Sequence, residues 1–248
     1  MTKATPNKCS AIAETTPPYN APVTLIIMDI HETIKEIKAQ FRLYMNGAVS
    51  KSMREKGLGY KLNFGIEYPR LKEIASGYEK NHDLAQALWK EDIRECKILA
   101  GLLQPVDTMF PEIAEIWIDG MTYPELADYT VMNLFQHLPY ASEVVFRWMA
   151  DDRERYLQCG FLLIARLFMK DLRLNERGEQ EFLDQAFVSL EDTRYPVVRK
   201  AAATALKKFG SQSPAARRAV LKQLTPLLKS PAPDTLSLAA SIRDELFQ

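Results

Sequence analysis

The chain is poor in glycine and in the alternating segments that form β-strands, and it has no long apolar run. Only 10 of its 248 residues are glycine. Because β-sheet proteins need glycine at their tight turns, this composition favours an all-helical chain. The most apolar early run, residues 23–28, is far too short to span a membrane, and no secretory signal precedes it. We therefore expect a cytoplasmic protein that does not enter a membrane.

Cysteine and histidine are scarce as well. The chain has three of each, at positions 9, 96 and 159 for cysteine and 31, 82 and 137 for histidine. These numbers and spacings exclude the disulfide framework of a small secreted protein and match no metal-binding motif. The sequence also lacks a glycine-rich phosphate loop and any residue order typical of nucleophilic catalysis. We expect no bound metal and no other cofactor.

Helical periodicity begins at residue 23 and continues almost to the end of the chain. Residues 1–22 contain four prolines and no periodic pattern, which indicates a flexible tail before a single domain over residues 23–248. Beyond the tail, apolar residues recur every three or four positions, as they do on one face of a helix. The expected helices cover residues 25–44, 68–77, 91–104, 108–120, 122–137, 140–150, 152–170, 179–190, 195–209, 214–229 and 234–247.

Several helix ends carry signals of their own. Thr122 begins a Thr-x-x-Glu capping box, and Ser213 and Asp234 are expected to cap the helices that follow them. Gly47 and Gly210 come after periodic segments, where a residue in the left-handed conformation would end a helix.

One repeated motif indicates how these helices are arranged. An aspartate at position 192 is followed by the string Val197-Val198-Arg199-Lys200-Ala201-Ala202 and by Ala205-Leu206. This pattern resembles the second helix of a HEAT repeat, and residues 151–165 resemble a more divergent copy. Stacked helical pairs of this kind form a superhelix whose concave face is usually the working surface. We predict an all-α fold, an α-solenoid of HEAT-like repeats.

A series of short motifs points to a family. They are Tyr44-Met45, Phe64-Gly65-Ile66, Tyr68–Ile74, Leu88-Trp89, Ile93–Glu95, Met121–Asp128, Trp148–Asp152 and Tyr156–Gln158. In this order the chain resembles the AlkD-like DNA alkylation repair proteins, the HEAT-like alkylpurine DNA glycosylases. The resemblance implies a C-shaped protein that holds duplex DNA on its concave face. It also implies release of cationic bases such as N7-methylguanine, without the pocket that other glycosylases use for a flipped base.

The resemblance assigns roles to five positions, of which this chain keeps two. Asp128 falls where the family has the carboxylate that stabilises the positively charged sugar as the base leaves, and Tyr44 matches an aromatic residue near it. Pro124 and Thr204 stand where the family has tryptophans, and Cys159 stands where it has an arginine that holds the DNA backbone. Proline and threonine offer no large aromatic face, and cysteine cannot bind a phosphate through two hydrogen bonds.

Two nearby side chains offer replacements. Tyr123 is adjacent to Pro124 and has an aromatic ring, and Arg155 precedes Cys159 by four residues, on the same face of a helix. We expect both, with Tyr44, to lie near the DNA and its lesion. The simpler interpretation is that the chain keeps the family's scaffold and has lost its excision site.

Charge is unevenly distributed, although the 32 basic and 32 acidic residues balance. Residues 106–154 contain ten acidic and two basic residues, whereas residues 194–233 contain nine basic and no acidic ones. Because neutralising phosphates supplies most of the affinity for DNA, the basic stretch predicts a DNA-binding surface. The predicted DNA-binding residues are Arg194, Arg199, Lys200, Lys207, Lys208, Arg217 and Arg218.

These residues are compatible with three functions. The first is a family protein that binds duplex DNA, in which any excision of alkylated purines depends on Asp128. The second is a non-enzymatic scaffold whose groove binds a protein partner or a basic peptide, because the middle of the chain is acidic. The third is a DNA-structure binder without chemistry, which recognises branched or bent duplexes by shape. The position of the basic side chains relative to Asp128 distinguishes the DNA-binding functions from the scaffold.

Overall fold

The computed structural model describes Met1 and residues 29–247, so the predicted tail, residues 1–22, lies outside the described part apart from its first residue. The described helices are α1 (Ile30–Leu43), α2 (Gly47–Glu55), α3 (Tyr68–Ser76), α4 (His82–Lys90), α5 (Arg94–Leu103), α6 (Pro111–Asp119), α7 (Pro124–Asn133), α8 (Ala141–Met149), α9 (Glu154–Met169), α10 (Glu176–Glu191), α11 (Pro196–Gly210), α12 (Pro214–Leu224) and α13 (Pro233–Leu246). Short 3-10 helices cover Val106–Thr108, Phe135–His137 and Leu227–Lys229. None of the described helices is long and apolar enough to cross a membrane.

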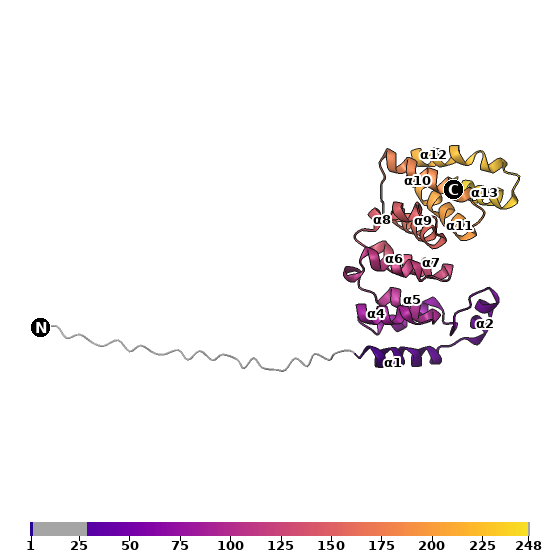
Figure 1. The fold of residues 1–248 in the computed structure, drawn as a ribbon. Helices are drawn as coiled ribbons and strands as arrows, with labels where there is room; N and C mark the ends of the chain where they lie inside the picture. The colour runs from indigo at the N-terminus through magenta and orange to yellow at the C-terminus, as the bar shows by residue number, and fades with distance from the viewer. Residues whose placement is uncertain (2–28, 248) are drawn as a thin grey trace.

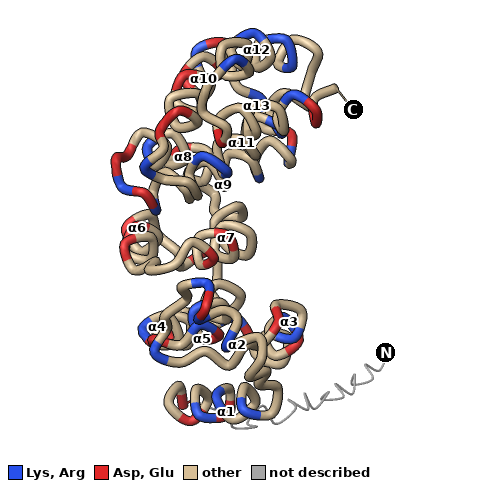
Figure 2. The backbone as a smooth tube through the Cα atoms, turned by 90° about the vertical axis from the view of Figure 1, so that its right-hand side faces the viewer, with Lys and Arg blue, Asp and Glu red and all other residues tan. Residues whose placement is uncertain are grey.

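The helices stack one above another into a single array, which confirms the predicted α-solenoid (Figure 1). Helices α5, α7, α9 and α11 pack in succession and form an inner row, and α4, α8 and α10 pack against α5, α9 and α11. The array bends, so that α3 near one end and α13 near the other lie on the same side as α7 (Figure 2). The inner row therefore lines the concave side of the bend.

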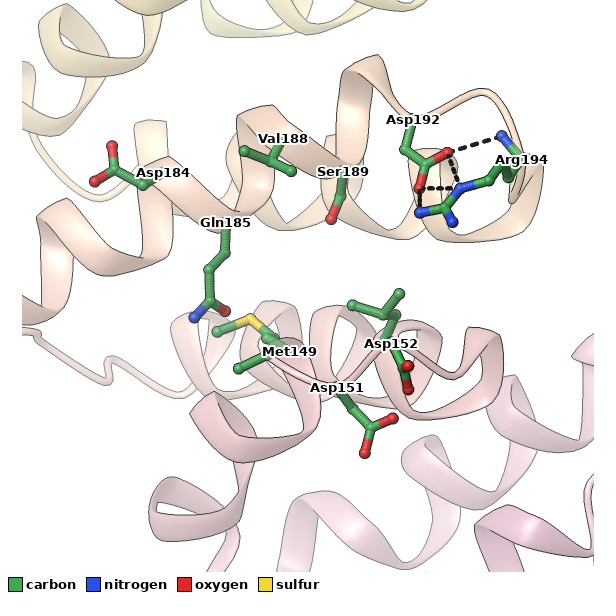
Figure 3. A pocket seen from close by; sticks show the side chains of 11 residues that line it. Met149, Asp151, Asp152, Asp184, Gln185, Val188, Ser189, Asp192 and Arg194 are labelled. Atoms are coloured by element: carbon green, nitrogen blue, oxygen red, sulfur yellow. Dashed lines mark hydrogen bonds and ion pairs between the residues drawn. The ribbon is translucent and has the colours of Figure 1, made fainter.

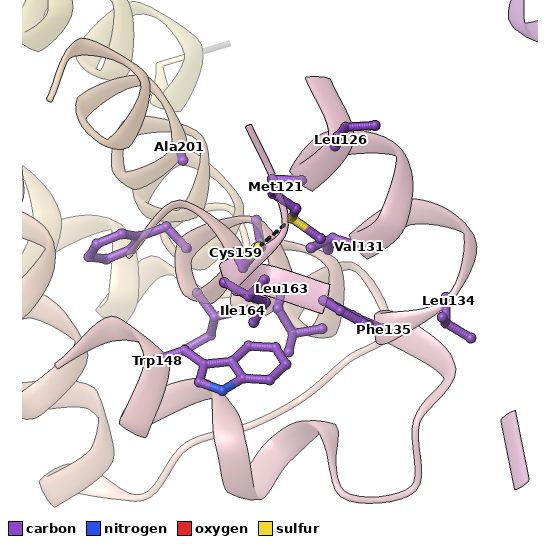
Figure 4. Close-up of a cluster of buried hydrophobic side chains, with 14 of the residues drawn as sticks. Met121, Leu126, Val131, Leu134, Phe135, Trp148, Cys159, Leu163, Ile164 and Ala201 are labelled. Atoms are coloured by element: carbon purple, nitrogen blue, oxygen red, sulfur yellow. Dashed lines mark hydrogen bonds between the residues drawn. The ribbon is translucent and has the colours of Figure 1, made fainter. Parts of the chain in front are cut away.

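Helix α9 lies at the centre of the array and contacts α7, α8 and α11. These contacts explain why its sequence is apolar nearly all round. Gly160 lies against the end of α8, where an added Cβ would be 2.7 Å from the backbone nitrogen of Met149. The fully buried Trp148 packs on Phe135, with 5.4 Å between ring centroids (Figure 4). Close packing at Gly160 determines the spacing of α8 and α9, and the ring contact holds α8 against the 3-10 helix Phe135–His137.

Of the three predicted N-terminal caps, one agrees with the structure. Ser213 caps α12, and its hydroxyl accepts a hydrogen bond from the backbone N–H of Ala216 at 3.0 Å. The capping box at Thr122 is wrong, because α7 begins two residues later, at a proline, without a side-chain cap bond. The cap at Asp234 is also wrong, since that residue lies inside the first turn of α13. In both helices proline occupies the first position, where its missing N–H costs no hydrogen bond.

Gly210 ends α11 as predicted, whereas Gly47 does not end α1, and neither glycine is a left-handed cap. Gly47 is the first residue of α2 and Gly210 is the last residue of α11. Neither has the positive φ of a left-handed cap. Gly210 instead permits close packing, because an added Cβ would lie 2.8 Å from Cδ2 of Leu246 in α13. The reason for glycine at this position is the contact between α11 and α13.

Candidate nucleic-acid interface

A hollow on the inner row brings together residues that the family resemblance singles out. It has a volume of about 220 Å³ and lies between α7, α9 and α11. Its lining consists of Pro124, Asp128, Gln158, Leu162, Val197, Lys200, Ala201 and Thr204. Asp128 thus lies beside two of the substituted positions, and none of the lining residues is aromatic.

The carboxylate of Asp128 is reached by solvent but is surrounded by protein on several sides. Burial raises its pKa, and the nearby carboxylate of Glu125 raises it further. Arg155 and Arg166 of α9 lower the same pKa, because positive charge favours the ionised form. From α11, Lys200 adds an exposed ammonium group to the rim. Asp128 therefore lies near three basic side chains and one further carboxylate, that of Glu125.

The start of α7 is held by a buried ion pair. Arg94 of α5 is 2% exposed and donates hydrogen bonds to both carboxylate oxygens of Glu125, at 3.0 to 3.2 Å. Its Nη1 donates to the carbonyl of Ile66 at 3.0 Å. The hydroxyl of Tyr60 donates to Glu125 at 3.0 Å, and burial together with Glu125 raises the pKa of Tyr60, which keeps that proton in place. This network positions the helix turn that carries Asp128.

The two predicted tyrosines are not part of the lining. Tyr44 directly follows α1, is exposed, and has the guanidinium of Arg70 4.6 Å above its ring. Tyr123 precedes α7, and its ring packs on that of Tyr60 with centroids 4.4 Å apart. Both rings are thus engaged by neighbours from the N-terminal part of the array.

Cys159 points away from the hollow and belongs to the core. It is fully buried, and its Sγ lies 3.8 Å from Sδ of Met121 (Figure 4). Burial raises the pKa of the thiol, so it is neutral at pH 7. The neighbouring Gln158 lines the hollow instead, and its Nε2 donates to the carbonyl of Pro124 at 3.1 Å. The α9 residue at this level of the hollow is therefore Gln158.

Sequence reasoning identified Arg155 but missed Arg166. Arg155 donates to Oε1 of Gln158 at 2.6 Å and pairs with Glu154 at 2.9 Å. Arg166 lies eight residues after Gln158, with the lining residue Leu162 halfway between them. Steps of three and four residues place all four side chains on one face of α9. That spacing was visible in the sequence and was the available signal for Arg166.

Metal ligands are not gathered anywhere in residues 29–247. Within that range no three His, Cys, Asp or Glu residues come close enough to hold an ion. Cys96 is buried like Cys159, and burial raises the pKa of its thiol to about 12, so neither thiol is a ready ligand. The groups that the hollow offers are a carboxylate, an amide, a hydroxyl and an ammonium.

Part of the basic C-terminal stretch is neutralised by neighbours in space. Lys207 and Lys208 both pair with Glu245, at 3.0 and 3.6 Å. Arg194 pairs with Asp192 at 2.7 Å. Both acidic partners lie outside residues 194–233. The stretch that contains no acidic residue in the sequence therefore has acidic neighbours in the folded chain.

The other predicted DNA-binding residues occupy three different environments. Arg199 is only 8% exposed, and its guanidinium donates to a carbonyl and a hydroxyl at 2.8 Å each. Arg217 and Arg218 are exposed on α12, at one end of the stack (Figure 2). Lys200 is the only member of the predicted set that lines the hollow with Asp128.

Arg194 lies at a separate groove, between α10 and the turn that joins α8 to α9 (Figure 3). This groove has a volume of about 400 Å³. Its apolar lining residues are Met149, Ala150, Leu157 and Val188, and its carboxylates are Asp151, Asp152, Asp184 and Asp192. Arg194 is the only basic residue in the lining, and it already pairs with Asp192. The groove is therefore acidic.

A family model described as DNA alkylation repair enzyme matches residues 37–239. The chain belongs to the DNA alkylation repair family. A solved structure described as "A new family of proteins related to the HEAT-like repeat DNA glycosylases with affinity for branched DNA structures" is similar to it, with a TM-score of 0.70 and 18% sequence identity. The likeness covers 89% of this chain and 94% of that one, and it confirms the HEAT-like fold. No curated protein matches the chain.

Proposed function

We propose that this family member binds DNA along its inner row of helices, with the sugar-phosphate backbone passing over the hollow. The observation that carries the proposal is the grouping of Arg155, Arg166 and Lys200 around Asp128. Arg155 is paired with Glu154, so Arg166 and Lys200 are the charges that favour phosphate groups, although the middle of the chain is acidic overall.

The DNA that suits this site best is a bent or branched duplex. The lining has no aromatic ring on which an unpaired base could stack, so recognition depends on charge and shape. The similar solved structure belongs to proteins with affinity for branched DNA, which supports the same class of ligand here.

Fluorescence anisotropy with a labelled duplex and a three-way junction tests this proposal. We expect tighter binding of the junction and a Kd that rises with salt, because each phosphate contact adds about 0.9 to the slope of log K against log salt. Lys200→Glu and Arg166→Glu should weaken binding. Arg147→Glu is the matched control, because Arg147 lies on α8, outside the inner row, and is 61% exposed. No binding at low salt, or equal binding by all three variants, would contradict the proposal.

Asp128 itself favours a second function, the excision of cationic purines. A positively charged base is already a good leaving group, so its release mainly requires negative charge beside the sugar. Asp128 supplies that charge when ionised; burial and Glu125 raise its pKa, and Arg155 and Arg166 oppose that shift. Single-turnover release of N7-methylguanine measures this activity. Asp128→Asn should abolish release with little change in Kd, and an unchanged rate would refute the role of Asp128. A wild-type protein that binds DNA but releases no base would rule out excision of this lesion.

The acidic groove beside α10 favours a third function, the binding of a basic peptide. Val188 is 71% exposed there, and Oε1 of Gln185 is buried without a hydrogen-bond partner in the described structure. A lysine or arginine side chain fits such a groove, because it has an apolar stem and a positive end. Calorimetry should show that an Arg-Leu repeat peptide binds more tightly than a Glu-Leu one, and that Asp152→Asn with Asp184→Asn reduces the difference. Equal binding of the two peptides would exclude this function.

A further inference from the structure

We infer that a second groove, between α11 and α13, binds a backbone phosphate of the DNA that lies over the hollow. This inference rests on the proposed DNA binding and extends it from the hollow to α13. The groove has a volume of about 470 Å³. Its lining consists of Pro196, Arg199, Lys200, Asp234, Ser237, Leu238 and Ser241.

The first argument is the buried charge of Arg199. Its Nε donates to the carbonyl of Leu190 and its Nη2 to the hydroxyl of Thr235, both at 2.8 Å. Both acceptors are neutral, and Arg199 forms no direct ion pair within the range 29–247; it lowers the pKa of Asp192, but that carboxylate pairs directly with Arg194. A guanidinium that is 8% exposed and lacks a carboxylate partner is a fixed positive charge in a poorly solvated place. An anion in the groove would compensate that charge.

The second argument is the set of groups around Arg199. Ser237 and Ser241 are one turn apart on α13, so their hydroxyls lie on one face and can donate to phosphate oxygens. Lys207, which pairs with Glu245, positions one of these hydroxyls, because its Nζ donates to Oγ of Ser241 at 2.8 Å. Asp234 is the one carboxylate of the lining, and it is exposed. The groove thus has two basic lining residues against one acidic residue, with hydroxyl donors between them.

The third argument is the position of the groove relative to the hollow. Lys200 lines both of them, so the two sites adjoin across α11. A strand whose phosphates contact Lys200 at the hollow continues naturally toward Arg199 and α13. A branched or bent duplex has a second arm or a displaced backbone that can occupy such an adjacent site, which connects the groove with the proposed class of DNA.

Charge substitutions of both signs at Ser237 test the inference. Ser237 is exposed, so lysine and glutamate are both accommodated there, and Leu236, its exposed neighbour on α13 outside the groove, provides the matched Leu236→Lys and Leu236→Glu controls. Anisotropy with the three-way junction is measured at 50 and 200 mM salt. One added phosphate contact steepens the salt dependence, so Ser237→Lys should increase the ratio of the two affinities by about 3.5-fold. Ser237→Glu should decrease that ratio and weaken binding.

Opposite effects of the two Ser237 variants exclude a simple folding defect, which would weaken binding in both. The inference is overturned if the Ser237 variants change binding no more than the Leu236 variants do. Absence of DNA binding by the wild-type protein would overturn the proposed function as well. If DNA binding is weakened by Lys200→Glu but is unaffected by charge at Ser237, only the inference that the α11–α13 groove binds a phosphate is overturned. The two failures are therefore distinguishable.

Discussion

Replacing Glu125 by alanine should destabilise the protein strongly, because that carboxylate holds α7 against α5. The substitution removes every acceptor that Glu125 offers to the buried guanidinium of Arg94. Arg94 then keeps the carbonyl of Ile66 at 3.0 Å and a longer contact of 3.5 Å with Glu95. The hydroxyl of Tyr60 also loses its acceptor. The result is a buried positive charge with incomplete compensation.

The size of the effect follows from the burial of the pair. Breaking a buried ion pair by removing one partner costs about 3–5 kcal/mol, because the remaining charge stays desolvated. The side chain of Glu125 is 20% exposed, so water can enter the vacated space. The expected loss is therefore near the lower end, about 3 kcal/mol. In a protein of this size that loss lowers Tm by about 6–12 °C.

Urea unfolding followed by circular dichroism measures the loss directly. The stacked rings of Trp89 and Trp117, 4.2 Å apart, give a second, fluorescent probe within the N-terminal half. Glu115→Ala is the matched control, because Glu115 pairs with Arg147 at the surface, where the side chains are 35% and 61% exposed. That variant should lose less than about 1 kcal/mol. Equal losses of stability for Glu125→Ala and Glu115→Ala would refute the conclusion that the buried Arg94–Glu125 pair holds α7 against α5.

Three further substitutions test the packing and the charges around the hollow. Gly160→Ala should cost about 1–3 kcal/mol, because its methyl group meets the end of α8, whereas Gly47→Ala has nothing within 4 Å and should be tolerated in the same unfolding assay. Tyr60→Phe should lose about 1.5–3 kcal/mol with the hydrogen bond to a charged acceptor, and no loss would show that water replaces the hydroxyl. The pKa of Asp128 is raised in the native state, so its ionised form destabilises the fold at neutral pH. Asp128→Asn should therefore be more stable than wild type at pH 7, and the difference should vanish as the pH falls below the unfolded-state pKa of about 4, whereas a constant difference would contradict this account.

The helical array was predictable from the sequence because each helix buries a face with the period of the helix itself. The helix ends were less predictable, because tertiary contacts override local capping signals. Thr122 and Glu125 have the spacing of a capping box, but Glu125 pairs with Arg94, 31 residues earlier. Gly210 has the place of a helix stop, but the approach of Leu246 decides its role. Neither distant partner is visible from the local sequence.

The candidate site was predictable in part. The grouping of Asp128 with Pro124 and Thr204 agrees with the family resemblance, because the spacing of α7, α9 and α11 depends only on the repeat fold. Cys159, which the resemblance places at the family's arginine, lies in the core, whereas the adjacent Gln158 lines the hollow, because one residue rotates a helix by about 100°. The pairing of basic residues with carboxylates outside their own stretch requires the folded chain.

Two positions of the lining, Pro124 and Thr204, do not contribute to the buried core. Pro124 is the first residue of α7, and Thr204 is exposed, with its hydroxyl bonded to the carbonyl of Lys200 at 2.9 Å. Neither side chain belongs to the buried core. The same solenoid therefore forms whichever residues occupy these positions, and membership of a DNA repair family does not decide between binding and excision. The lining combines one carboxylate, Asp128, with one ammonium group, Lys200, and it has no ring on which a displaced base could stack, so the proposed assays of binding and of base release are both needed.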